Sequence, residues 1–224
     1  MKPYLNVLLS AVVLSGWMVS GSLRAANSIF PSTKGSTWKY VSSDGRDSTV
    51  SIIMSSARHV TVKSTGAMTL VRHFVRNAYG WNSREICRVQ MHSVRGGRPK
   101  IDIVQASGVV IPRTVLWKPR FTWSYSMQAS ASASSGPYSA SVKARVHCRC
   151  RITGVKKIQV PAGVFRCFRV EVISETTTHK RVLNHTHIRH IKAHCVEYFA
   201  KGVGLVEVIK NHVTRKLARY HIAR

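Results

Sequence analysis

Acidic residues are scarce in this chain: its 224 residues include eight aspartates and glutamates against 35 lysines and arginines, a formal net charge of +27. The few carboxylates are scattered, with Asp44 and Asp47 together in a predicted turn, so the flanking acid pair that glycoside hydrolysis needs is not visible. The sequence also lacks the Gly-x-Ser-x-Gly, His-Glu-x-x-His and phosphate-loop motifs. We therefore expect a protein without enzymatic activity and without a cofactor.

Long apolar runs are also lacking, apart from one at the N-terminus. Residues 1–26 contain Lys2, a short apolar stretch and small residues up to Ala25 and Ala26, the pattern of a secretory signal peptide. The apolar stretch is shorter than the roughly 20 residues that a membrane-spanning helix requires. We expect cleavage near Ala25 or Ala26. The mature chain, 27–224, is predicted to be a single antiparallel β domain that is periplasmic or secreted and does not span a membrane.

A helical period of 3.6 residues is absent too, except for a weak trace in the last dozen residues, which also alternate. Alternation with a period of two dominates and is strongest from Ser141 to Ile152. The apolar parity of this segment consists of Val142, Ala144, Val146, Cys148, Cys150 and Ile152. The opposite parity consists of Lys143, Arg145, His147, Arg149 and Arg151. Since strand side chains alternate between faces, these cations are predicted to form a solvent-facing row with a spacing of about 7 Å.

Several other segments read as strands because they are rich in β-branched and aromatic residues and are separated by glycine and proline. They are Val50–Met54, Arg58–Lys63, Met68–Val75, Glu85–Arg95, Ile101–Gln105 and Val164–Ile173. The small-residue stretch Gln128–Ser135 is predicted to end a hairpin, with a mobile lip over a binding cleft as the alternative. The chain is therefore predicted to be all-β, with a solvent-exposed, cationic face on an antiparallel sheet.

The cysteines and histidines leave two questions open. The cysteines Cys87, Cys148, Cys150, Cys167 and Cys195 allow two disulfides in an oxidising compartment, or buried free thiols. A His-rich segment, 179–195, suggests zinc or copper ligands, but its spacing matches no standard zinc pattern and cations lie among its histidines. We expect exposed strand histidines, cysteines packed toward the core, and no metal site.

Three short motifs carry a resemblance to a known family. The first is Phe30-Pro31, Gly35 and Trp38-x-Tyr40; the others are Val160-Pro161-Ala162-Gly163-Val164-Phe165-Arg166-Cys167 and Tyr198-Phe199-Ala200-Lys201-Gly202-Val203-Gly204-Leu205-Val206. In order and spacing the chain resembles a family of exported bacterial proteins of unknown function, the TapB-like proteins. The resemblance implies one large, strongly curved antiparallel sheet, a half-barrel similar to envelope lipid-carrier folds, with no catalytic residues to carry over.

The first motif also has a faint internal echo. Pro112 and Pro119 precede Trp123-x-Tyr125 much as Phe30-Pro31 precedes Trp38-x-Tyr40. Each copy reads as a proline-containing approach that leads into a strand opening with Trp-x-Tyr.

Two binding functions follow from these features. By fold-level analogy, the concave apolar face is expected to hold a lipid-like or hydrophobic ligand. Alternatively, the row of Lys143, Arg145, His147, Arg149 and Arg151 contacts anionic envelope surfaces or polymers. The charge also suits an acidic medium, because few native contacts then depend on ionised carboxylates. Nucleic acid is an improbable partner, since the chain is exported and the cations lack interleaved aromatics for base stacking. The oligomeric state is left open.

Overall fold

The described residues form one continuous 14-stranded sheet. A computed structural model of the protein describes residues 28–29, 31–66, 69–90, 100–102, 106–135, 138–182 and 185–223. The predicted signal peptide, residues 1–26, lies outside them. Every strand pairing in the sheet is antiparallel, so the predicted all-β, antiparallel architecture is confirmed.

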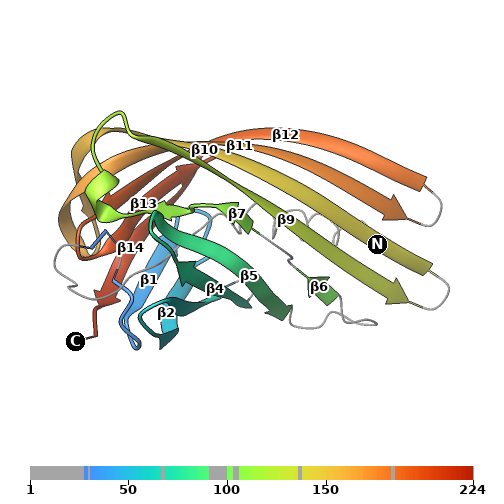
Figure 1. Ribbon diagram of the computed structural model, residues 1–224, viewed down its shortest axis with the longest axis horizontal. Coiled ribbons are helices and arrows are strands. Elements are labelled where there is room, and N and C mark those ends of the chain that lie inside the picture. The colour runs from blue at the N-terminus through green and yellow to red at the C-terminus, as the bar shows by residue number, and fades with distance from the viewer. Residues whose placement is uncertain are drawn as a thin grey trace.

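The strands differ greatly in length, and those in the middle of the chain are the longest. Their bounds are β1 Thr37–Ser42, β2 Ser48–Ser55, β3 His59–Thr65, β4 Thr69–Arg76, β5 Gly80–Gln90, β6 Lys100–Asp102, β7 Ala106–Gly108, β8 Ile111–Pro112, β9 Thr122–Ser135, β10 Tyr138–Val160, β11 Gly163–Val182, β12 His185–Ala200, β13 Gly204–Lys210 and β14 Val213–His221. In Figure 1 the long strands β9 to β12 extend well past the shorter β1, β2 and β4.

The sheet consists of two meanders joined edge to edge. Strands β1 to β5 follow one another across the sheet, and so do β9 to β14; β14 then pairs with β1. The Trp-x-Tyr echo found in the sequence opens both meanders, because Trp38 and Tyr40 lie on β1 and Trp123 and Tyr125 lie on β9. The repeated motif therefore marks the first strand of each meander.

The sheet curves until its two free edges approach each other, forming a nearly closed barrel. The short segment that contains β7 and β8 connects these edges: β7 pairs with β9, and β8 pairs with β5. Two hydrogen bonds to Val110 reinforce the connection, since its N–H donates to the Trp81 carbonyl at 2.9 Å and its carbonyl accepts from Trp123 Nε1 at 3.1 Å. The predicted strong curvature is thus confirmed.

The period-two pattern of the sequence is reproduced on β10. Its predicted apolar parity, Val142 to Ile152, is buried, and the cationic parity, Lys143 to Arg151, is exposed. The strand extends beyond the predicted segment at both ends and contains a bulge between Ile152 and Gly154. The other predicted strands overlap β2, β3, β4, β5, β6 and β11. Residues 68, 91–95 and 103–105, which belong to three of these predictions, lie outside the described residues.

The predicted turns are found as well. Gln128–Ser135 forms the end of β9, and Ser135 pairs with Tyr138 across a hairpin, as the sequence predicted. Pro161 and Ala162 form the turn between β10 and β11, and residues 201–203 connect β12 to β13. Both of these turns reverse the chain between two strands that are neighbours in the sheet.

Buried aliphatic and aromatic side chains from both meanders form the hydrophobic core. Trp38 Nε1 donates to the Val203 carbonyl at 2.7 Å, and the Tyr40 hydroxyl donates to the Leu205 carbonyl at 3.0 Å. These bonds join residues 165 positions apart in the sequence. The polar ends of the two aromatic side chains thus secure β1 against the start of β13, because a buried N–H or O–H requires a partner.

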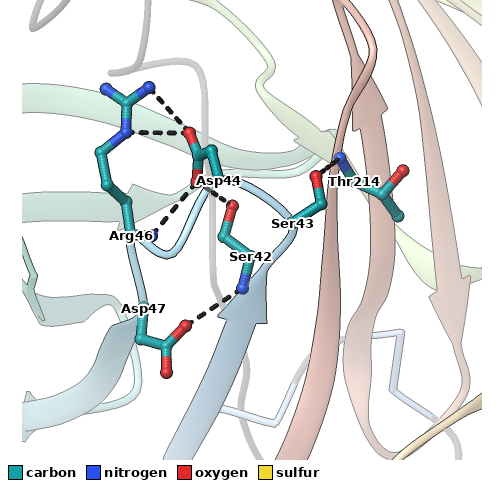
Figure 2. A network of polar contacts seen from close by, with 6 residues as sticks. All are labelled: Ser42, Ser43, Asp44, Arg46, Asp47 and Thr214. Carbon is teal, nitrogen blue, oxygen red and sulfur yellow. Dashed lines mark hydrogen bonds and ion pairs between the residues drawn. The ribbon is translucent and has the colours of Figure 1, made fainter.

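The turn between β1 and β2 is held by polar contacts (Figure 2). The Asp44 carboxylate accepts hydrogen bonds from the Ser42 hydroxyl and from Arg46 Nε, the latter at 2.8 Å. The bond from Ser42 and the nearby Arg46 guanidinium lower the pKa of Asp44. The Ser43 hydroxyl accepts the N–H of Thr214 at 3.0 Å, which fastens the turn to β14. Two of the chain's few carboxylates, Asp44 and Asp47, are therefore placed in this turn.

Candidate functional site

The predicted cationic row occupies the outer side of the long strands. Its members, Lys143, Arg145, His147, Arg149 and Arg151, are all exposed along β10. On one side the row is flanked by β9, whose paired residues are Ser130, Gln128, Ser126, Ser124 and Thr122. On the other side β11 contributes His179, Thr177, Glu175, Ile173 and Glu171. We call the exposed side of β9 to β12 around this row the outer cationic face.

Two carboxylates on β11 partly neutralise this face: Glu171, which lies opposite Arg151 and pairs with Arg169, and Glu175. Glu175 Oε1 lies 2.6 Å from Arg149 Nη2 and 3.7 Å from Lys192 Nζ, so a single acid is shared by two cations. Lys143, Arg145 and Arg151 have no carboxylate within ion-pair distance in the described part of the chain. The exposed ion pairs of Glu175 contribute little to stability. Internal pairing therefore does not explain why this row of cations is present.

Histidines add to the same face. His147 shares a hydrogen bond with the Ser126 hydroxyl at 2.9 Å, and His190 shares one with the Thr177 hydroxyl at 3.1 Å. His179 and His194 are exposed nearby on β11 and β12. Among the described residues no group of three or more His, Cys, Asp or Glu side chains is arranged to hold a metal ion. The exposed placement of these histidines agrees with the sequence prediction.

The inner side of the same strands carries a polar cluster that the sequence did not single out. Cys150, Val172, Cys195 and Lys210 are successive cross-strand partners from β10 to β13. Glu197 lies two residues beyond Cys195 on the same parity, and the Cys195 thiol donates to Glu197 Oε1 at 3.7 Å. The inner polar cluster, as we call it, consists of the polar groups among these residues together with Tyr125 and Cys148, which share a side-chain hydrogen bond and lie within electrostatic range of Glu197.

Burial controls the chemistry of this cluster. Partial removal from solvent raises the pKa of Glu197 to about 7, although the Cys195 hydrogen bond and the Lys210 charge oppose the shift. Desolvation likewise lowers the pKa of Lys210, while the Cys195 and Glu197 charges act in the opposite direction. Glu197 can therefore gain or lose its charge close to neutral pH.

The thiols are free and poorly ionised. Cys148, Cys150, Cys167 and Cys195 are unpaired, so they form no disulfide with one another; the side chain of Cys87 lies outside the described residues. Burial raises the pKa of the Cys167 thiol to about 12 and raises those of the other three as well. Since the thiolate is the reactive form, these cysteines are packing groups in this state. Cys148 and Cys150 point into the core, as predicted.

Sequence reasoning missed the charged residues on inner parities. Arg72 shares a parity with Leu70 and Phe74 on β4, and all three are buried. Glu197 similarly shares a parity with Cys195 and Phe199. A charge on the apolar parity of a strand was the available signal, and it would have placed both side chains inside the sheet.

One family model matches part of the chain. Residues 122–212, which run from the start of β9 to the turn after β13, match the model of the DUF3108-like family. No curated protein matches the sequence significantly. The described residues include no helix that is long and apolar enough to cross a membrane. The closer assignment to TapB-like proteins stays a prediction.

Two solved structures are similar in shape. One, from Bacteroides fragilis, is described as an exported protein with a YmcC-like fold; it aligns with a TM-score of 0.44 and 12% identity over 86% of this chain and 98% of that chain. The other, from Parabacteroides distasonis, is described as a lipoprotein; it aligns with a TM-score of 0.42 and 12% identity over 88% of this chain and 99% of that chain. Similarity at this level transfers neither a ligand nor an activity to this chain.

Proposed function

We propose that the protein is an exported, non-catalytic binding protein whose outer cationic face contacts anionic surfaces of the cell envelope. The row of exposed cations on β10 carries this proposal, because Lys143, Arg145 and Arg151 form no ion pair in the described part of the chain. An anionic polymer or lipid headgroup would supply the missing counter-charge. Export by the predicted signal peptide, with cleavage near Ala25 or Ala26, would bring the face into contact with such surfaces.

The binding free energy expected from each cation favours an extended anionic surface over a single small anion as the partner. Each lysine or arginine close to an anionic membrane contributes about 1 kcal/mol of binding free energy. A row of several cations therefore gives measurable binding, although no one contact is strong. Because the contacts are exposed, salt weakens them over a Debye length of about 10 Å at 0.1 M.

Charge reversal on the row tests the proposal. We expect the variant Lys143→Glu/Arg145→Glu/Arg151→Glu to bind vesicles of phosphatidylcholine and phosphatidylglycerol about 100-fold more weakly than the unmodified protein, as the loss of about 3 kcal/mol implies. Cosedimentation at low and high salt measures this. Vesicles of phosphatidylcholine alone should bind neither protein.

A matched variant controls for net charge. Lys34→Glu/Arg58→Glu/Lys63→Glu reverses three exposed cations on and near the first meander and changes the net charge by the same amount. It should retain most of the binding. Equal losses in the two variants would mean that overall charge, rather than the outer cationic face, attracts the vesicles, and the proposal would then be wrong.

A second function, the binding of a lipid-like or hydrophobic ligand on the concave face, is favoured by a separate observation. The inner face is not fully closed along β12: Ala193, Cys195 and Glu197 lie on the inner parity and retain contact with solvent. A ligand could approach the apolar interior there. A lipid retained by the natively purified protein would be direct evidence for this function.

A further inference from the structure

Arg72 is a charged side chain in an apolar place. It lies on β4 between the inward-facing Leu70 and Phe74 and pairs across the sheet with Val62, and all of these neighbours are buried. Only 5% of Arg72 is exposed. Its Nε is buried and has no hydrogen-bond partner. Such a group is costly to bury, so native proteins nearly always provide a partner for it.

The charges around Arg72 make its position less favourable still. Desolvation lowers the pKa of Arg72 to about 10; Tyr125 opposes this effect, and the positive charge of Arg215 adds to it. In the described part of the chain no carboxylate forms an ion pair with Arg72. A buried guanidinium group normally has an anionic partner, whereas the charged group within electrostatic range of Arg72 is a second cation, Arg215.

Arg215 differs from Arg72 in its surroundings. It lies on β14, opposite Ser42, and the turn drawn in Figure 2 brings Asp44 and Asp47 close enough to favour its charge. The carboxylates of that turn are already engaged with Ser42 and Arg46. The positive charge at Arg72 is thus left uncompensated by the described residues, whereas that at Arg215 is partly balanced.

Replacing a buried charge with an apolar side chain of similar volume is often stabilising, so a charge kept in such a place calls for a functional reason. The planar guanidinium group matches a carboxylate or phosphate with two parallel hydrogen bonds. We propose that Arg72, with the positive charge of Arg215 nearby, binds the carboxylate or phosphate group of an amphiphilic ligand whose apolar part lies on the concave face. This inference rests on the proposed lipid-like ligand and adds the chemistry of its headgroup.

Three probes with one alkyl chain test the headgroup: dodecanoate, dodecyl phosphate and dodecanol, titrated by calorimetry into protein that has been freed of bound lipid. We expect the unmodified protein to bind one of the anions at least about tenfold more tightly than dodecanol, since one charge-assisted hydrogen bond accounts for that factor. The variant Arg72→Met should lose this preference and retain its affinity for dodecanol. The control Arg58→Met, at an exposed position, should behave as the unmodified protein.

The probes separate the failure of this inference from the failure of the ligand proposal. Equal binding of all three probes would keep the lipid-like ligand and overturn the anion site. If none of the three probes binds, the proposal of an amphiphilic ligand is wrong. Titration with inorganic phosphate then tests the anion site alone. If phosphate binds to the unmodified protein and not to Arg72→Met, the ligand of Arg72 is a free phosphate. No binding of phosphate either would overturn the site itself.

Thermal stability gives a second readout. In the absence of ligand, Arg72→Met should melt at a higher temperature than the unmodified protein, and the preferred anion should stabilise only proteins that retain Arg72. A lower melting temperature together with unchanged binding of the anion would mean that Arg72 has an internal structural partner, which overturns the proposal. If Arg72→Met does not fold, Arg72→Lys decides: it keeps the charge without the planar fork and should weaken only the binding of the anions.

Discussion

Glu197 shows how one partly buried carboxyl group couples this fold to pH. It lies on the inner face of β12 beside Cys195, and desolvation raises its pKa from the ordinary value of 4.5 to about 7. Between these two values the folded protein retains a proton that the unfolded chain has lost. The free energy of unfolding therefore decreases as the pH rises through this interval and levels off above it.

Glu197→Gln tests this coupling. The amide cannot ionise, so we expect the variant to be more stable than the unmodified protein at about pH 8, by about 1–3 kcal/mol, and nearly equal to it at about pH 4.5. Urea unfolding at several pH values measures the difference. Glu175→Gln, which removes an exposed ion pair, should change stability by less than about 1 kcal/mol at any of them. A variant with the same pH dependence as the unmodified protein would contradict the assignment.

Closure of the sheet depends on a close backbone approach between β5 and β8. Gly80 begins β5 opposite Pro112, with a φ of 149°, a conformation that side chains rarely adopt. A Cβ at this position would lie 2.2 Å from the Ile111 carbonyl oxygen and 2.9 Å from Pro112 Cα. Since both contacts are with backbone, no side-chain rotation relieves them.

Gly80→Ala should therefore destabilise the protein by about 2–4 kcal/mol, the range seen when a strained position and a tight contact combine. Gly154→Ala is the matched control, because a Cβ there meets nothing within 4 Å and the residue lies beside the bulge of β10. It should be neutral or slightly stabilising. Denaturant unfolding compares the two, and equal stabilities would show that the β5–β8 contact is not required for the fold.

For the molecule as a whole, the net charge of +27 has a cost as well as a use. Like charges repel one another in the compact state, and salt screens that repulsion. The same screening weakens contact with anionic surfaces. Salt should therefore act in opposite directions on folding and on surface binding.

We expect the melting temperature of the unmodified protein to rise by about 2–4 °C from low salt to about 0.3 M NaCl, corresponding to about 1 kcal/mol. The charge-reversed variant of Lys143, Arg145 and Arg151 carries fewer net charges and should show a smaller rise. Thermal denaturation followed by circular dichroism measures both. A fall with salt in either protein would mean that attractive surface pairs outweigh the repulsion.

Much of the fold was predictable because it depends on local alternation. The burial of Cys148 and Cys150 and the exposure of Arg145 follow from their parity on one strand. The pairing of β14 with β1 was not predictable, since its partners come from opposite ends of the chain. The outer cationic face could be predicted from local alternation. The surroundings of Arg72 could not, because they depend on pairings between strands that are far apart in the sequence.

Period-two alternation alone was enough to specify an all-β chain with a cationic outer face, because a strand assigns each side chain to a face from its position in the sequence. It does not specify which strands meet across the interior. The approach of Arg72 to Tyr125 and Arg215 depends on the order of the strands and on the curvature of the whole sheet. Those long-range contacts, which only the three-dimensional structure contains, decide where charge is buried and what it can bind.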